Sequence, residues 1–228
     1  MGDKKRKEAR IKTVKQVIVV GACVLFVILM ILSGTSSHWL TIFKVIKPGD
    51  TVAIDYTMYD ATGNPLLTSN QQTYTAAAAK GRYILYSQPL SMTAGQNLTK
   101  SIYPVSVATS STELTTQFAL VRTEYESINQ AIIGMKTGDR KRIQIPNSSE
   151  PKLWDAETVT SSGLNVSDLT VGGLLPMAMS DNPDALSANS SVTYVRFGEI
   201  MSKTDDGIVV DVNYPAADIS IVSINANS

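Results

Sequence analysis

The chain has 228 residues, 43% hydrophobic and 18% charged, which suffices for one or two small domains with apolar cores. Its formal net charge is zero, but seven of its 20 basic residues lie in the first fifteen positions. The rest of the chain is therefore acidic, and we expect no nucleic-acid partner, because nucleic-acid binding needs a basic surface. One cysteine and one histidine exclude a disulfide framework, a Cys/His zinc site and a Ser-His-Asp triad, so we expect neither a metal nor a cofactor.

An uncharged, apolar segment follows the basic N-terminus. Roughly sixteen to twenty helical residues are as long as the hydrocarbon core of a bilayer is thick, and upstream basic residues hold an N-terminus in the cytoplasm. The pattern predicts a cytoplasmic tail at 1–15, a transmembrane anchor at 16–38 and a linker at 39–44. The protein would then be a single-pass protein of the cell membrane, with its C-terminal domain outside the cytoplasm. Small residues at 33–37 leave a cleaved signal peptide as the alternative.

Two turns and a strand are predicted next. Pro and Gly mark a turn at 47–50, and apolar residues alternate with polar ones over 52–57, which is typical of a strand with one buried face. A second turn at 62–65 leads into the hydrophobic pair Leu66 and Leu67.

A long, polar segment spans 69–127. The Gln/Thr/Ala-rich stretch 69–79 and the Ser/Thr-rich stretch 104–116 predict solvated loops. The stretches 82–86 and 117–122 predict short strands.

A helix, a turn and a strand are predicted over 128–146. Apolar residues recur at helical spacing over 128–135, and Gly134 suits a left-handed cap at the helix end. A Gly-containing turn at 136–139 precedes basic residues that alternate with apolar ones over 140–145. Because so short a helix is unstable alone, we expect it to pack on a sheet that includes this strand.

The C-terminal third predicts a small β unit and two closing strands. The unit contains a Gly-rich turn and apolar residues at 168–179, and alternating residues at 193–200. An Asp-Gly turn at 205–207 then precedes apolar strands at 208–212 and 219–223.

The segment 131–146, AIIGMKTGDRKRIQIP, resembles the FKBP family of peptidyl-prolyl cis-trans isomerases. Two further segments match the family in order: the turn, tyrosine-bearing strand and hydrophobic pair at 48–67, and the segment 213–223, which is similar to the closing strand of SlyD-like members. The resemblance implies an α+β fold, in which a single N-terminal transmembrane helix precedes an FKBP-like antiparallel β-sheet wrapped on a short helix, with a small β-rich insert domain. The implied domains are an FKBP-like core at 45–150 with an insertion at 69–127, an insert-in-flap-like domain at 151–204, and the final core strands at 205–228.

The same resemblance implies a site. In the family, aromatic rings and an aspartate form an apolar cleft that binds the twisted amide of an X-Pro bond, which lowers a rotation barrier of about 18–20 kcal/mol without an acid or a nucleophile. Leu66 and Ile221 stand where the family has phenylalanine, Leu67 stands where it has the aspartate, and Glu124 and Tyr125 replace a valine and an isoleucine. The implied catalytic residues are Tyr56, Leu66, Leu67, Ile128 and Ile221. The implied substrate-binding residues are Tyr125, Trp154, Met177 and Met179.

Two functions follow from this resemblance. The first is a membrane-tethered, extracytoplasmic prolyl isomerase and folding chaperone of weak activity. It would act on proline-containing or unfolded polypeptides and would contact the lipid bilayer through its N-terminal helix. The alternative is a catalytically inactive FKBP-like binding or structural subunit of a membrane or cell-envelope assembly.

Overall fold

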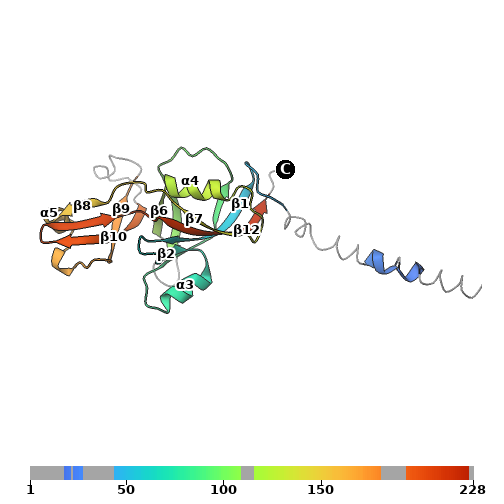
Figure 1. Cartoon of the computed structure of the whole chain (residues 1–228), viewed down its shortest axis with the longest axis horizontal. Helices are drawn as coiled ribbons and strands as arrows, with labels where there is room; N and C mark the ends of the chain where they lie inside the picture. Colours follow the sequence, from blue (N-terminus) through green and yellow to red (C-terminus); the bar gives the residue numbers. More distant parts are fainter. Residues whose placement is uncertain (1–17, 22, 28–43, 109–115, 181–193, 226–228) are drawn as a thin grey trace, which may run out of the picture. The chain divides into compact units, whose positions relative to one another are not determined.

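The computed structural model describes residues 18–21, 23–27, 44–108, 116–180 and 194–225 (Figure 1). The chain divides into two units, Met1–Phe43 and Lys44–Ser228.

The prediction of a transmembrane helix is wrong for the residues that the structure describes. In the first unit, residues 18–21 and 23–27 are helical and exposed. A membrane span needs about 20 consecutive helical residues, and none of the described helices is long and apolar enough to cross a membrane. The cytoplasmic tail predicted at 1–15, the rest of the predicted anchor and the linker up to residue 43 lie outside the described residues.

The Lys44–Ser228 unit is built on one curled sheet of twelve strands (Figure 1). Ten strands form a continuous path, β4 (Leu90–Thr93) pairs with β1, and β9 (Leu174–Met179) pairs with β10. The path runs β7 (Arg140–Gln144), β12 (Ala216–Asn225), β1 (Thr51–Tyr59), β2 (Pro65–Thr68), β3 (Leu85–Ser87), β5 (Ile102–Ala108), β6 (Thr116–Val121), β10 (Tyr194–Thr204), β11 (Gly207–Asp211) and β8 (Lys152–Asp155).

The predicted α+β fold class is therefore wrong, because it expected a different proportion of strands to helices. The expected α+β fold had a sheet wrapped on one short helix, whereas the unit is mostly sheet, with a few short helices. The physical reason lies in the segment 69–127, where β5 buries Ile102, Val105 and Val107 and where β3 to β6 all join the sheet. The helices are α3 (Gln71–Ala78), α4 (Arg122–Ala131), α5 (Ala156–Ser161) and the 3-10 turn η1 (Val166–Asp168).

Strands predicted from alternation are found at β1, β7 and β12, and the apolar strand predicted after the Asp-Gly turn is found at β11. β1 pairs antiparallel with β12, so that Tyr56 lies opposite Ile219, and a bulge shifts the register at Ala53/Ile54. β7 pairs with the other side of β12, with Arg142 opposite Asp218. These three strands present apolar side chains to the core and polar side chains to the other face of the sheet.

Helix α4 covers the apolar face of this part of the sheet. It ends at Ala131, close to the predicted end at Gly134, and Gly134 follows with a φ of +85° and donates its N–H to the carbonyl of Ile46. It begins earlier than predicted because the Glu124 carboxylate accepts the main-chain N–H of Val121 at 3.0 Å, which satisfies one donor at the helix start. Ile128 and Glu124 are buried.

Helix α3 replaces the solvated loop predicted at 69–79. The Asn70 side chain accepts the N–H of Thr73 at 2.9 Å, which caps the helix, and the alanines that follow have the highest helix propensity of any residue. The helix lies on the sheet side opposite α4 (Figure 1).

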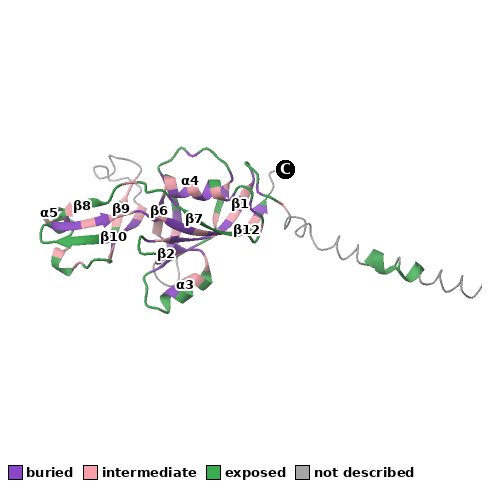
Figure 2. Cartoon of the chain, viewed as in Figure 1, coloured by how far each residue is buried: buried purple, intermediate pink, exposed green. Residues whose placement is uncertain are grey.

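Among the described residues, two clusters of buried apolar side chains hold the unit together. Figure 2 shows buried residues along the strands and on α4. The larger cluster lies between α4 and the sheet. The smaller one consists of Val159, Leu175, Ile200, Ile208 and Val210. β10 contributes to both, with Phe197 in the first and Ile200 in the second. β11 was assigned to the closing strands of the core, yet its side chains lie in the smaller cluster, and it pairs with β8 and β10.

Candidate functional site

The five residues with implied catalytic roles all lie in the larger core cluster. None is more than 2% exposed. The Tyr56 hydroxyl accepts a hydrogen bond from Ser87 Oγ at 2.8 Å, and burial raises the pKa of this tyrosine. None of the cavities described below is lined by Leu66, Leu67, Ile128 or Ile221. These side chains therefore fill the core side of the sheet.

The four residues expected to bind substrate are divided between two places. Tyr125 is buried, and its ring stacks on that of Tyr103 with centroids 4.2 Å apart. Trp154 and Met177 pack against the smaller cluster, and Met179 lies half-buried at the end of β9. The structure thus does not gather the nine predicted residues around one opening.

A buried ion pair lies beside the start of α4, and sequence reasoning missed it. Arg196 is 0% exposed and binds Glu124 through two hydrogen bonds, of 3.0 and 2.5 Å. Its remaining donors bind the carbonyls of Ala119, at 2.8 Å, and Val212, and its guanidinium carbon lies 4.2 Å from the centre of the Tyr214 ring. A fully paired guanidinium here ties β10 to the helix. The signal in the sequence was an arginine inside the apolar strand VRFGEI.

A cavity of about 800 Å³ lies between the turn after β1 and the strands β9 and β10. We call it the turn-insert groove. Its apolar wall contains Phe197, Tyr83, Leu174 and Pro176, and the rings of Tyr83 and Phe197 are 5.1 Å apart at an angle of 50°. Tyr83 is 47% exposed, so its ring is accessible to a ligand. The other lining residues are Asp60, Asn64, Arg82 and Gly172.

Local structure fixes both walls of the turn-insert groove. Asp60 Oδ1 accepts the N–H of Asn64 at 2.7 Å, which closes the turn after β1, and Gly63 adopts the left-handed conformation that this turn requires. On the other wall, the antiparallel register places Phe197 opposite Pro176, so both side chains lie on one face of the β9–β10 pair. The Tyr214 hydroxyl donates to the Phe197 carbonyl at 2.7 Å and holds this part of β10 in place.

Glu199 lies on the same face of β10, two residues beyond Phe197. It is 6% exposed, and its Oε2 atom has no hydrogen-bond partner among the described residues. Burial raises the pKa of this carboxyl, the negative charges of Asp60 and Asp211 add to the rise, and the main-chain amides of Ala61 and Thr62 oppose it. The region where the β1–β2 turn meets β10 therefore contains a carboxyl group whose ionised form is disfavoured.

We expect Glu199→Gln to stabilise the protein at neutral pH. The pKa of Glu199 in the folded protein lies above its ordinary value of 4.5, so between these two values the folded protein binds more protons than the unfolded one. The contribution of Glu199 to the free energy of unfolding therefore decreases as the pH rises from the ordinary pKa to the raised pKa of the folded protein. It is regained when the pH falls below that range. In urea unfolding from pH 4.5 to 8, the free energy of unfolding should decline less for Glu199→Gln than for the wild type. The control Glu150→Gln, at an exposed position, should show the same decline as the wild type. An unchanged decline in Glu199→Gln would contradict this reading.

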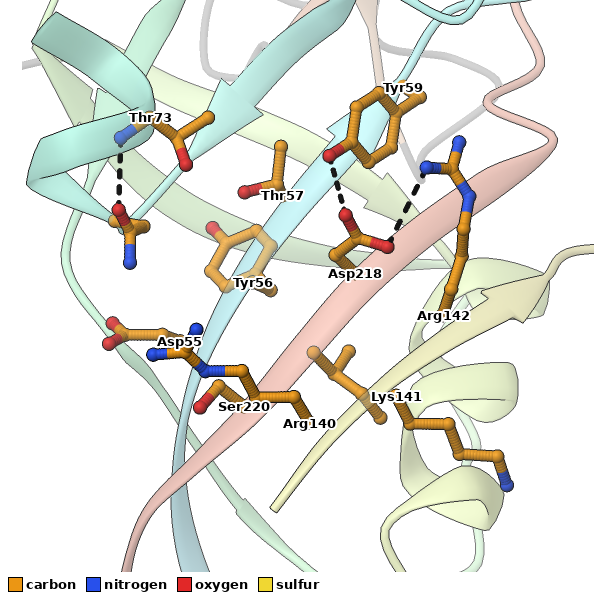
Figure 3. Close-up of a pocket in the computed structure, with 12 residues that line it drawn as sticks. Asp55, Tyr56, Thr57, Tyr59, Thr73, Arg140, Lys141, Arg142, Asp218 and Ser220 are labelled. Atoms are coloured by element: carbon orange, nitrogen blue, oxygen red, sulfur yellow. Dashed lines mark hydrogen bonds and ion pairs between the residues drawn. The ribbon is translucent and has the colours of Figure 1, made fainter. Parts of the chain in front are cut away.

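A second cavity, of about 300 Å³, lies on the polar face of the sheet over β1, β12 and β7 (Figure 3). The Tyr59 hydroxyl donates to Asp218 Oδ2 at 2.6 Å, and Arg142 lies 3.8 Å from Asp218 Oδ1. Burial, together with the hydrogen bond and the charge of Asp218, raises the pKa of Tyr59 to about 12. Asn70 and Thr73, at the start of α3, close the opposite side of the cavity. Its lining is mostly polar and charged, unlike that of the turn-insert groove.

Comparisons with known proteins identify no family for this chain, so the candidate site is chosen from the geometry described above. The chain matches no model of a protein family, and no characterised protein sequence matches it. Within the described ranges, no group of three or more His, Cys, Asp and Glu side chains is arranged to hold a metal ion. The turn-insert groove, with aromatic side chains and a few polar groups at one opening, is therefore the candidate site.

Proposed function

We propose that the Lys44–Ser228 unit is a polypeptide-binding module that takes an apolar, proline-containing segment into the turn-insert groove. The observation that carries this proposal is the aromatic pair of Tyr83 and Phe197 on the wall of an 800 Å³ opening. The resemblance of three segments to FKBP-type isomerases supports the same class of ligand.

The lining of the turn-insert groove suits a peptide. Leu174 and Pro176 extend the aromatic wall, and burying a proline ring on such a surface contributes roughly 1–2 kcal/mol at about 25 cal/mol per Å². Opposite them, Asn64 and Arg82 offer hydrogen-bonding groups for the main chain of the ligand, and the Arg82 guanidinium donates to Asn64 Oδ1. A few polar groups set in an apolar wall fix orientation as well as affinity.

The far end of the sheet adds a second apolar surface. Leu153 on β8 is 70% exposed and pairs with Val209 on β11, which in turn lies opposite Ser202 on β10. Met201, at the bulge beside Ser202, is also exposed. Exposed apolar side chains at this end of the sheet suit a module that holds longer unfolded segments.

Prolyl isomerisation in the same groove is the second candidate function. Its support is Asp60, a carboxylate that lines the groove with the two aromatic rings, since rings and an aspartate are the parts of the cleft that the resemblance implies. Binding alone does not accelerate rotation, because each tenfold in rate needs about 1.4 kcal/mol of extra affinity for the twisted amide. We therefore expect weak turnover at most.

Tyr83→Ala tests both candidates. We expect the variant to bind a labelled Ala-Leu-Pro-Phe peptide about five to ten times more weakly than the wild type, because it loses an aromatic contact. Fluorescence anisotropy measures the affinity, and a protease-coupled assay on the same peptide measures isomerisation. Tyr74→Ala is the matched control, because Tyr74 lies on α3, contacts Tyr86 on β3 and does not line the groove.

The two readouts separate the two candidates. If Tyr83→Ala binds the peptide more weakly and the wild type does not isomerise it, the results support a binding module. Turnover by the wild type that falls in Tyr83→Ala supports isomerisation in the groove. Equal affinities of the wild type and Tyr83→Ala would contradict both candidates.

A further inference from the structure

β7 is an edge strand of the sheet. It lies at one end of the strand order, and β12 is its one strand neighbour in the described part of the chain. Four of its five side chains are exposed, and only Ile143 is buried. No strand of the described residues covers the other side of β7.

Along this side, the main-chain groups of β7 have no strand partner within the part of the chain that the structure describes. Just beyond the strand, Ile145 donates its N–H to the carbonyl of Pro215 at 2.9 Å, so residue 145 faces β12. In an antiparallel pair, residues two apart face the same neighbour, and the residues between them face away. The N–H and C=O groups of Arg140, Arg142 and Gln144 therefore point to the side away from β12, where they offer hydrogen bonds to an added strand.

The edge is strongly cationic. Arg140, Lys141 and Arg142 follow one another, and all three are exposed. Arg140 and Arg142 line the polar cavity over β12 and β1, and Figure 3 shows both side chains on that face. A strand added to β7 would place alternate side chains beside these two arginines.

The acidic residues of the polar cavity leave part of this charge unpaired. Asp218 accepts from Tyr59 and pairs with Arg142, an exposed pair at 3.8 Å that contributes little. Asp55 accepts from Ser69 Oγ at 2.9 Å. Among the described residues, Arg140 and Lys141 have no acidic side chain within 4.0 Å. The cavity and the edge thus favour an anionic ligand.

We propose that β7 is a docking edge for an extended acidic segment of another polypeptide, which adds as a further antiparallel strand and places acidic side chains at alternate positions beside Arg140 and Arg142. A second copy of this chain fits poorly, because a β7–β7 pair sets three cations against three cations, and like charges opposite each other are destabilising. This surface is separate from the turn-insert groove, since the two share no lining residue.

The test uses the full-length chain and a fluorescein-labelled peptide of alternating valine and glutamate, eight residues long. We expect the double variant Arg140→Glu/Arg142→Glu to bind this peptide about tenfold or more weakly than the wild type. Lys152→Glu, on the opposite edge strand β8, should bind like the wild type. All variants keep the same basic N-terminus, so any contribution of the N-terminus to peptide affinity cancels when the variants are compared with the wild type. Exchange protection of the Arg140, Arg142 and Gln144 amides in the complex should report the added strand.

Three results would overturn the proposal. One is equal affinity of the double variant and the wild type. Another is undiminished binding of a peptide N-methylated at alternate positions, in both registers, since such a peptide cannot complete the strand hydrogen bonds. The third is β7-dependent binding to phosphatidylserine vesicles but not to the glutamate peptide, which would identify the edge as a membrane contact.

Discussion

Arg196→Met is expected to destabilise the protein by about 3–5 kcal/mol. Arg196 is fully buried, and its removal leaves the Glu124 carboxylate in the core without its cation. The carbonyls of Ala119 and Val212 lose donors at the same time. Against a typical total stability of about 5–15 kcal/mol, this loss is large. Urea unfolding, followed by circular dichroism, measures it.

The matched control is Arg142→Met, which removes an arginine from an exposed ion pair. The Arg142 side chain is 53% exposed, and we expect the substitution to lower the free energy of unfolding by about 0–1 kcal/mol. Glu124→Leu combined with Arg196→Met should recover part of the loss, because an apolar pair leaves no buried charge. A loss for Arg196→Met that is no greater than that for Arg142→Met would show that the buried pair does not hold β10 to α4.

Leu67→Asp is the second large effect, and we expect it to unfold much of the protein. Leu67 is 0% exposed on β2, so the substitution removes a packed side chain and introduces a carboxylate without a partner. The expected loss is more than about 4 kcal/mol, measured as the change in urea midpoint and melting temperature. Leu153→Asp, at a leucine that is 70% exposed on β8, should leave both nearly unchanged.

This result also separates two views of the site. If Leu67 faced an open isomerase cleft, as the resemblance implies, an aspartate there would be tolerated and would raise turnover. If Leu67 fills the core, the aspartate lowers stability and adds no turnover. A stable Leu67→Asp variant with increased isomerase activity would contradict the packed core that we describe.

Local patterns predicted much of the sheet. Alternation of apolar and polar residues gave β1, β7 and β12, and Gly134 gave the end of α4, because each of these depends on neighbours in the chain. Composition misled at α3, where Gln, Thr and Ala were read as a loop although Asn70 provides a cap and the alanines favour a helix.

Contacts between distant residues were beyond the reach of these patterns. Arg196 and Glu124 are 72 residues apart, and nothing near either residue identifies its partner. The turn-insert groove likewise unites Asp60, Tyr83 and Phe197 from separate segments. The insertion at 69–127 was the main obstacle, because β5 lies partly in the stretch 104–116 that was predicted as a loop, and nothing local shows that the strands of this segment join the main sheet.

Titration of the ¹⁵N-labelled protein with the Ala-Leu-Pro-Phe peptide, followed by NMR, tests most directly whether a peptide binds in the turn-insert groove. Binding in the turn-insert groove predicts the largest shifts at the amides of Asn64, Tyr83, Leu174 and Phe197. The core amides of Tyr56, Leu66 and Ile128 should move little, because their side chains are sealed from solvent. Shifts concentrated at those core residues, or no saturable shifts in the groove, would contradict the account.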